Sequence, residues 1–226
     1  MSTNQIQKAN LLDLVMESKK VISVHGNQKF PARGTGTTTP IVVDHLQMVQ
    51  PGVTAVLASY IAEMVVECNE RIDKKNLKVD EENSGKPLNQ RGKMEPLISM
   101  IAGSKFSETL AYKVAEMVKM PFLPAVRNGK SWKDLQGENV AYVADVIVTG
   151  TTMHDAVDEI TCSRGMCKEI FAVFDFNFNL AKAPGEVKIN SLLNTTDLLH
   201  MDPVALWVNE KTNINLFRKT KGLVAI

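Results

Sequence analysis

The sequence has few cysteines, few aromatic residues and no excess of charge of either sign. It contains 3 cysteines in 226 residues, and aromatic residues make up 6% of the chain. A small, odd number of cysteines is atypical of a disulfide-stabilised secreted domain. Lys and Arg number 26 against 25 Asp and Glu, so the net charge of +1 creates no global field for nucleic acid or an anionic membrane, although a local basic patch stays compatible. We therefore expect neither nucleic acid nor a membrane among the partners.

Long apolar segments and paired metal ligands are also missing. No uncharged apolar run approaches the roughly 18–20 residues that span a bilayer, and the polar residues 1–8 lack the order of a signal peptide. Cys162 and Cys167 have no second ligand pair nearby, and the 4 histidines are scattered, so the spacing does not favour zinc. These absences predict a cytoplasmic protein whose side chains hold no metal ion directly.

The remaining composition is that of a globular protein. Hydrophobic residues make up 44% of the chain and charged residues 23%. A chain of this length buries about 70% of its surface on folding and needs no disulfide or metal for stability. No internal repeat or domain boundary is visible, so we expect one domain over residues 1–226.

Hydrophobic periodicity alternates between strand and helix through most of the chain. Apolar residues recur at helical spacing over 6–19 and 52–71, with short strands expected at 21–24 and 41–43 beside a breaker-rich loop at 31–40. Further strands are expected over 97–101, 122–126, 140–144 and 170–174, and helices over 107–117 and 153–162. Strands alternating with helices predict an α/β fold with a central, mostly parallel sheet flanked by helices.

Residues 70–95 depart from this pattern because they are charged and poor in apolar side chains. We interpret the segment as a surface insertion, an exposed excursion from the fold. The alternative is a basic patch that binds a polyanion.

The most informative segment is 140–157, in which an apolar strand leads through an acid and a hydroxyl-rich turn into a helix. Backbone N–H groups at a helix N-terminus favour an anion, and Gly150 allows the backbone to approach it closely. The Thr149, Thr151 and Thr152 hydroxyls add hydrogen-bond donors, while Asp145 is placed to accept hydrogen bonds from sugar hydroxyls. The turn therefore favours a phosphate site, although an ordinary strand–turn–helix with a Thr cap fits the spacing as well.

Asp145 to Thr152 resembles the phosphoribosyl-diphosphate (PRPP) signature of type I phosphoribosyltransferases. In that signature an apolar run and two acids precede a Thr-Gly-x-Thr turn. The order of segments over about residues 9–200 is most similar to orotate phosphoribosyltransferase, including the Gly36 and Pro40 segment and the strand and loop at 98–116. The resemblance implies a single phosphoribosyltransferase-like domain with a small hood formed by the two ends of the chain.

The resemblance also implies an activity and its residues. The enzyme would transfer the phosphoribosyl group of PRPP to a nitrogen base, orotate or a related pyrimidine, with release of pyrophosphate. Mg²⁺ would be carried on PRPP, and the active form would be a homodimer. The implied catalytic residues are Asp145, Arg127, Lys130 and Lys133; the implied PRPP-binding residues are Val148, Thr149, Gly150, Thr151, Thr152 and Lys105; the implied base-binding residues are Phe176, Thr37 and Thr38.

Several positions depart from the family pattern. Ala144 stands where the first signature acid is expected, and the loop after Arg127 is short and lacks a His. Phe176 and Phe178 follow the strand after which an orotate-binding Arg is expected. They suggest either a stacking base pocket or core filling. These departures support an alternative, a catalytically impaired phosphoribosyltransferase-fold protein that binds PRPP or a nucleotide as a sensor, regulator or assembly partner.

Overall fold

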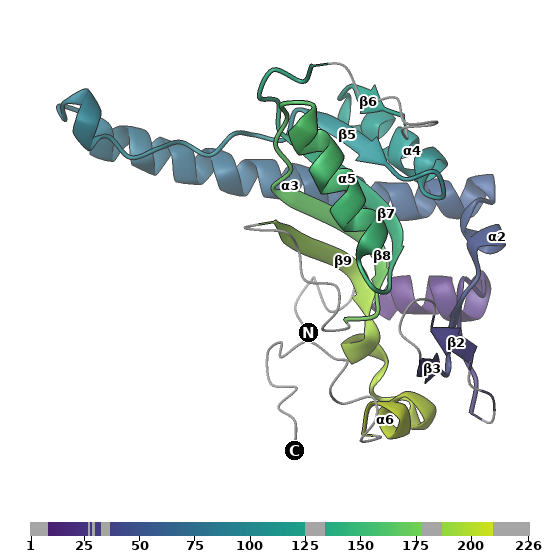
Figure 1. Ribbon diagram of the computed structural model, residues 1–226. Coiled ribbons are helices and arrows are strands. Elements are labelled where there is room, and N and C mark those ends of the chain that lie inside the picture. Colours follow the sequence, from purple (N-terminus) through teal and green to yellow (C-terminus); the bar gives the residue numbers. More distant parts are fainter. Residues whose placement is uncertain are drawn as a thin grey trace.

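The central feature of the fold is a five-stranded parallel sheet with strand order β6-β5-β7-β8-β9 (Figure 1). The computed structural model of the chain describes residues 9–26, 28, 30–32, 37–124, 134–177 and 187–209. The strands are β5 (Met100–Gly103), β6 (Phe122–Leu123), β7 (Val140–Ile147), β8 (Glu169–Asp175) and β9 (Lys188–Asn194). The expected α/β class with a parallel sheet is confirmed.

Helices cover both faces of this sheet. Because side chains alternate along a strand, Ala141 and Val143 share one core with helices α3 (Pro51–Asn83) and α4 (Glu108–Val118), while Val140 and Tyr142 share another with α5 (Thr151–Cys162). Nearly all of β7 and every residue of β8 is buried, as expected for parallel strands covered on both sides. The two cores fix β7 and the start of α5 rigidly.

Helix α4 approaches β5 very closely. A Cβ atom on Gly103 would lie 2.5 Å from the Cβ of Ala111, which is closer than real Cβ contacts. Gly103 is therefore required by packing, and it ends β5 directly before the loop that reaches the candidate site.

The two ends of the described chain meet in a small hood. Strand β1 (Ile22–Val24) pairs with β4 (Ile41–Val43), and β2 (Phe30–Ala32) pairs with β3 (Thr37–Thr39), all antiparallel. The 31–40 segment, expected to be a loop, thus contributes β2 and β3. The short helices are η1 (Asp13–Ser18), α2 (His45–Met48), η2 (Leu88–Gln90), η3 (Thr195–Leu198) and α6 (Asp202–Asn209). The fully buried Trp207 of α6 donates a hydrogen bond of 2.6 Å to the Thr38 carbonyl, which ties the hood together.

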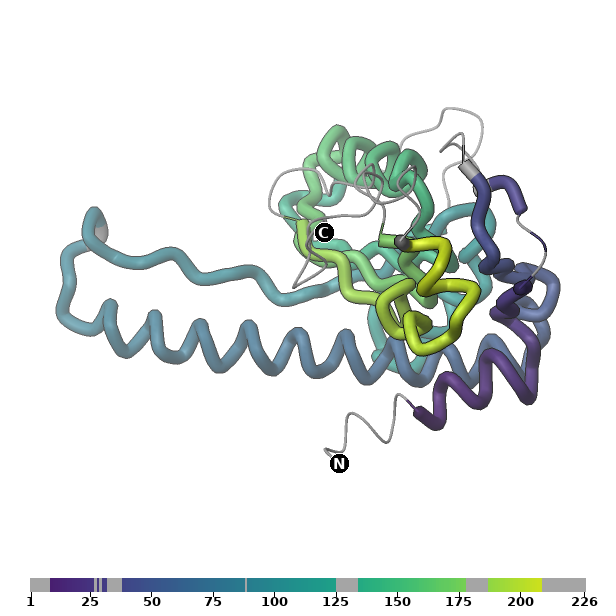
Figure 2. Tube along the Cα trace, turned by 90° about the horizontal axis from the view of Figure 1, so that it is seen from below, coloured from purple at the N-terminus to yellow at the C-terminus, as the bar shows by residue number. Residues whose placement is uncertain are grey.

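Helix α3 is much longer than its periodicity predicts. The helix was expected to end at residue 71, but it continues to Asn83 and leaves the body of the molecule, while the chain returns beside it (Figures 1 and 2). Its last buried side chain is Ile72. We call residues 73–97 the arm. Its lack of apolar residues reflects the absence of a neighbour to pack against, whereas its Lys, Glu and Leu residues favour helix.

By length and composition α3 is the one described helix that could cross a membrane. Its apolar side chains instead form part of the core with α4 and the sheet, among them Leu57, Ile61 and Val65, which are fully buried. The buried core helix of a globular protein can have the same length and apolar composition as a membrane-spanning helix.

Candidate functional site

A cavity of about 590 Å³ opens at the carboxyl ends of β5 and β7. Ligands of open α/β sheets bind at this edge. Residues 144–153 form most of its wall, and side chains from the hood and from the β5–α4 loop complete it. These side chains are His45, Ser104 and Phe106, together with Tyr142 from β7. The segment singled out in the sequence therefore lines a cavity of the size that small molecules occupy.

The turn into α5 has the geometry of an anion site. Gly150 is the N-cap of the helix and has φ of +81°, a left-handed conformation that glycine adopts without strain. The first N–H groups of α5 have no carbonyl partner inside the helix. Thr149 Oγ1 lies 3.0 Å from Thr151 Oγ1, and Thr151 and Thr152 are exposed to the cavity mouth. Val148 to Thr152 thus line one cavity together, and backbone N–H groups at a helix start favour an anion.

Asp145 faces the same cavity but lies within a strand. The sequence predicts a turn from residue 145, whereas β7 continues to Ile147 because the buried β8 pairs with it to that point. Asp145 Oδ1 accepts a hydrogen bond of 2.8 Å from the Val146 N–H. Asp145 Oδ2 is buried and makes no hydrogen bond of regular geometry. That oxygen can accept from a ligand only if the ligand displaces His45, whose Nδ1 lies 2.8 Å away.

His45 is a site residue that the sequence did not reveal. Its Nδ1 lies 2.8 Å from Asp145 Oδ2, and its side chain is 55% exposed. The contact to Asp145 raises the pKa of His45 above the ordinary 6.5, with a smaller contribution from Asp44, so the two groups form an ion pair when the imidazole is protonated. No spacing signal links residues so far apart. The local signal is Asp44, which caps α2 by accepting from Leu46 N and Gln47 N and so places His45 at the start of the helix.

The β5–α4 loop forms the opposite wall. Ser107 Oγ accepts from Ser104 N at 2.9 Å and donates to the Val143 carbonyl at 2.7 Å, which fixes the loop against β7. Lys105 lies exposed on this turn, between two residues that line the cavity. Burial raises the pKa of Tyr142, so its phenol stays neutral and can donate a hydrogen bond.

Other predicted residues lie elsewhere. Phe176 is 5% exposed, packs edge-to-face on Phe174 at 5.0 Å between ring centroids, and does not line the cavity. Thr37 and Thr38 lie in β3, where the Thr38 carbonyl is held by the hood tryptophan. Residues outside the described part of the chain are Arg127, Lys130, Lys133 and Phe178.

The three cysteines differ in burial. Cys68 and Cys167 are buried, and burial raises the pKa of the Cys167 thiol to about 12; Cys162 is exposed. Within the described ranges, no group of three or more His, Cys, Asp or Glu side chains could hold a metal ion.

Comparison with protein families and with characterised proteins finds no match in sequence. Solved structures do match. An orotate phosphoribosyltransferase of Francisella tularensis superposes with a TM-score of 0.61 at 11% identity, over 89% of this chain and 95% of that chain. UMP synthase of Leishmania donovani gives a TM-score of 0.56 at 14% identity, over 93% of this chain and 41% of that chain. An adenine phosphoribosyltransferase of Trypanosoma brucei, solved with AMP, pyrophosphate and ribose-5-phosphate, gives a TM-score of 0.52 at 15% identity, over 87% of this chain and 83% of that chain.

The chain has the type I phosphoribosyltransferase fold. Orotate and adenine phosphoribosyltransferases share this architecture with it, and identities of 11–15% establish the fold alone. The Asp145–Thr152 segment, which resembles the PRPP signature, has one acid where that signature has two, and it has a glycine at the start of the helix.

Proposed function

We propose that the chain is a phosphoribosyltransferase. It transfers the phosphoribosyl group of PRPP to a nitrogen base, orotate or a related pyrimidine, and releases pyrophosphate. The observation that carries this proposal is the cavity that the Gly150-capped start of α5 and the Asp145 side chain line together. One end supplies donors for a phosphate, and the other supplies an acceptor for sugar hydroxyls, as a phosphorylated ribose requires.

In the proposed reaction, the base nitrogen attacks C1 of the ribose. The C1–O bond to pyrophosphate breaks, and its electron pair leaves with the pyrophosphate. Backbone N–H groups and Thr hydroxyls at residues 148–152 hold the 5′-phosphate. Asp145 accepts hydrogen bonds from the ribose hydroxyls, and its negative charge stabilises the positive charge that develops on the ring. Lys105, Arg127, Lys130 and Lys133 are proposed to neutralise the pyrophosphate.

Mg²⁺ fits this proposal as a partner carried on PRPP. Among the described residues that line the cavity, Asp145 is the only acid, and Mg²⁺ is usually held by one or two carboxylates together with substrate phosphates. The ion would neutralise the leaving pyrophosphate. We further propose that each chain forms one domain over residues 1–226, with the 70–95 segment as a surface insertion. Two chains would form a cytoplasmic homodimer.

A second candidate is a protein that binds PRPP or a nucleotide without turnover. Two observations favour it. Ala144 stands in place of one acid of the signature, and His45, when protonated, pairs with the remaining acid at a distance of 2.8 Å. A site with less negative charge stabilises a developing positive charge less well, while its phosphate cradle, made largely of backbone, is unaffected.

Turnover separates the two candidates. The protein is incubated with PRPP, Mg²⁺ and each of a panel of pyrimidine and purine bases, and pyrophosphate release is measured. Release with a pyrimidine that falls at least tenfold in Asp145→Asn, but not in Asp155→Asn on the exposed face of α5, supports the enzyme. PRPP binding without release from any base supports the binding protein.

A further inference from the structure

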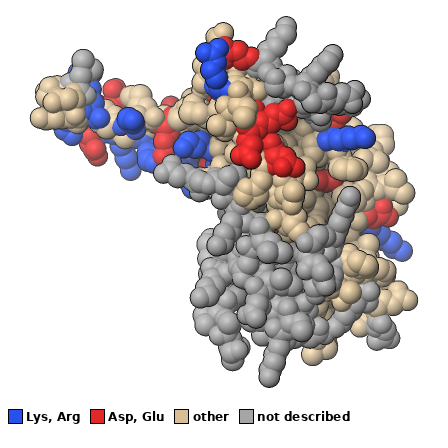
Figure 3. All heavy atoms as spheres, in the orientation of Figure 1, with Lys and Arg blue, Asp and Glu red and all other residues tan. Residues whose placement is uncertain are grey.

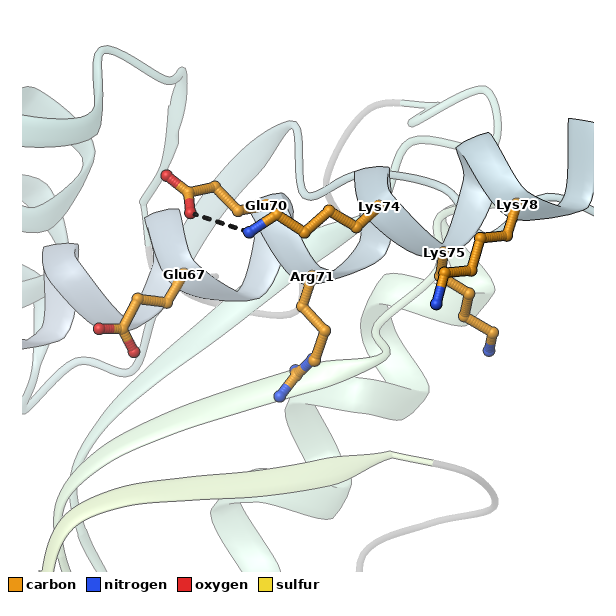
Figure 4. A pocket seen from close by; sticks show the side chains of 6 residues that line it. All are labelled: Glu67, Glu70, Arg71, Lys74, Lys75 and Lys78. Atoms are coloured by element: carbon orange, nitrogen blue, oxygen red, sulfur yellow. Dashed lines mark ion pairs between the residues drawn. The ribbon is translucent and has the colours of Figure 1, made fainter. Parts of the chain in front are cut away.

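A second hollow lies on the other side of the sheet from the PRPP cavity. It has a volume of about 540 Å³ and sits under α3 where the arm leaves the body (Figure 4). Its lining residues all come from α3: Glu67, Glu70, Arg71, Lys74, Lys75 and Lys78. Arg71 reaches across to Glu169, the first residue of β8, so the hollow faces the amino ends of the strands. It is therefore separate from the site at their carboxyl ends.

The cations of this hollow form one row. Arg71, Lys74, Lys75 and Lys78 are spaced i, i+3, i+4 and i+7, which places them on one face of the helix over about 10 Å. In Figure 4, Arg71, Lys75 and Lys78 extend below the helix toward the strands. Acids bound the row at both ends, with Glu67 and Glu70 toward the body and Glu82 toward the tip. The row thus has a defined length.

The arm that carries the row is held rigidly by a ladder of asparagines. Asn69, Asn76 and Asn83 recur every seven residues, and each side-chain amide makes two hydrogen bonds, of 2.7–3.0 Å, to one backbone residue of the returning chain. The partners are Ile98, Glu95 and Gly92. Seven helical residues and three extended residues both advance by about 10 Å, so the two segments stay in register. The ladder fixes the arm although no side chain of α3 beyond Ile72 is buried.

The charges of the row are only partly neutralised. The buried Glu169 carboxylate is held by Arg71 at 3.4 Å and by Asn190 at 2.6 Å, so Arg71 forms the floor of the hollow. Lys75 pairs with Glu95. Lys74 lies 4.0 Å from Glu70, is 76% exposed and can swing away, and Lys78 has no ion-pair partner among the described residues. Lys and Arg side chains follow the arm, with acids between them (Figure 3).

More positive charge lies close to this row. The pKa of Glu95 is lowered first by its hydrogen bond from Lys75, and further by the charges of Lys188 and Lys168. These two lysines stand at the amino ends of β9 and β8. Basic residues from three elements therefore converge on the region where the arm joins the body.

We propose that this hollow binds a compact anion with two or three linked phosphates, either a free phosphate chain or the phosphate tail of a nucleotide. A row of about 10 Å bounded by acids fits such a chain and disfavours a long polymer. Lysines contact phosphates as point charges, and among the described residues no aromatic side chain lines the hollow to stack on a base. The phosphates alone are recognised. This binding is independent of the PRPP site.

The test uses inorganic tripolyphosphate, titrated calorimetrically into the full chain at low ionic strength. In the Lys74→Gln/Lys78→Gln variant we expect binding about tenfold weaker, because each exposed charge contact contributes about two- to fivefold. The matched control, Lys86→Gln/Lys93→Gln, removes the same charge from arm lysines outside the hollow and should bind as the parent does. Asp145→Asn should also retain tripolyphosphate binding.

Any of the following results with tripolyphosphate or DNA would overturn the proposal: no binding by the parent chain, equal losses in the two double variants, loss in Asp145→Asn, or tighter binding of a twenty-nucleotide oligothymidylate than of tripolyphosphate. ATP distinguishes the two sources of the anion. Binding of ATP as tight as that of tripolyphosphate supports recognition of a nucleotide tail, whereas binding of tripolyphosphate alone supports a free phosphate chain. ATP binding that survives in the Lys74→Gln/Lys78→Gln variant contradicts both.

Discussion

At the scale of single residues, the candidate site depends on the pair formed by Asp145 and His45. Asp145 is the acid that we propose accepts from the ribose hydroxyls, and its Oδ2 is buried. His45 approaches that oxygen from the hood. The hood thus sets the charge of a site that the sheet and α5 build.

The pair should make stability depend on pH. Because the pKa of His45 is raised above 6.5 in the folded state by Asp145, its contribution is fully present below about pH 6.5 and is lost as the pH rises through the raised pKa. His45 is half exposed, so we expect less than about 1 kcal/mol. In thermal unfolding, His45→Gln should lower the Tm by up to about 2–4 °C at pH 5.5, and by less at pH 8.5.

His200→Gln is the control for this measurement, because the His200 Nδ1 lies 3.0 Å from the Asp197 carbonyl oxygen instead of a carboxylate. A Tm difference for His45→Gln that grows with rising pH would contradict the ion pair.

At the scale of elements, α4 and α5 place the two walls of the cavity. Gly103→Ala should force α4 away from β5, since its Cβ would lie 2.5 Å from that of Ala111. We expect a loss of about 1–3 kcal/mol in the free energy of unfolding, measured by urea denaturation. Gly52→Ala is the control, because nothing lies within 4 Å of a Cβ there and alanine favours the helix. Equal stability of the two variants would show that the packing is not tight.

The asparagine ladder should control how readily the returning chain of the arm opens. Asn76→Ala removes the middle rung, which bonds the Glu95 N–H and carbonyl at 2.8 Å each. The global free energy of unfolding should change little because the arm is exposed, but the returning chain should open locally. We expect trypsin to cleave after Arg91 and Lys93 several times faster than in the parent. Trypsin should cleave the control variant, Asn89→Ala in η2, at the parental rate. Cleavage of Asn76→Ala at the parental rate would show that the ladder does not hold the arm.

The sequence predicts some elements well for identifiable reasons. Buried parallel strands such as β7 and β8 are continuous apolar runs, and the turn at Gly150 combines a strand, a glycine and hydroxyls. The arm could not be predicted, because its helix lacks the apolar stripe on which periodicity depends and its return is fixed by side-chain amides. The His45–Asp145 contact could not be predicted either, because it joins two segments that only the folded hood brings together.

At the scale of the whole molecule, the sheet separates two proposed anion sites, one at the carboxyl ends of its strands and one at the amino ends. Replacing residues 74–94 with a short Gly-Ser linker should leave the fold intact, because no side chain beyond Ile72 in α3 is buried. We expect a Tm within a few degrees of the parent, unchanged PRPP binding and loss of tripolyphosphate binding. Loss of PRPP binding in this variant would show that the two sites are coupled.

We propose that the cavity at Asp145 and Gly150 holds a phosphoribosyl group. Calorimetric titration with PRPP and Mg²⁺ tests it most directly, on the parent chain, Asp145→Asn and the control Asp155→Asn. The account predicts saturable binding with one site per chain, weakened about tenfold or more in Asp145→Asn and unchanged in Asp155→Asn. Absence of binding by the parent, or equal binding by all three proteins, would contradict it.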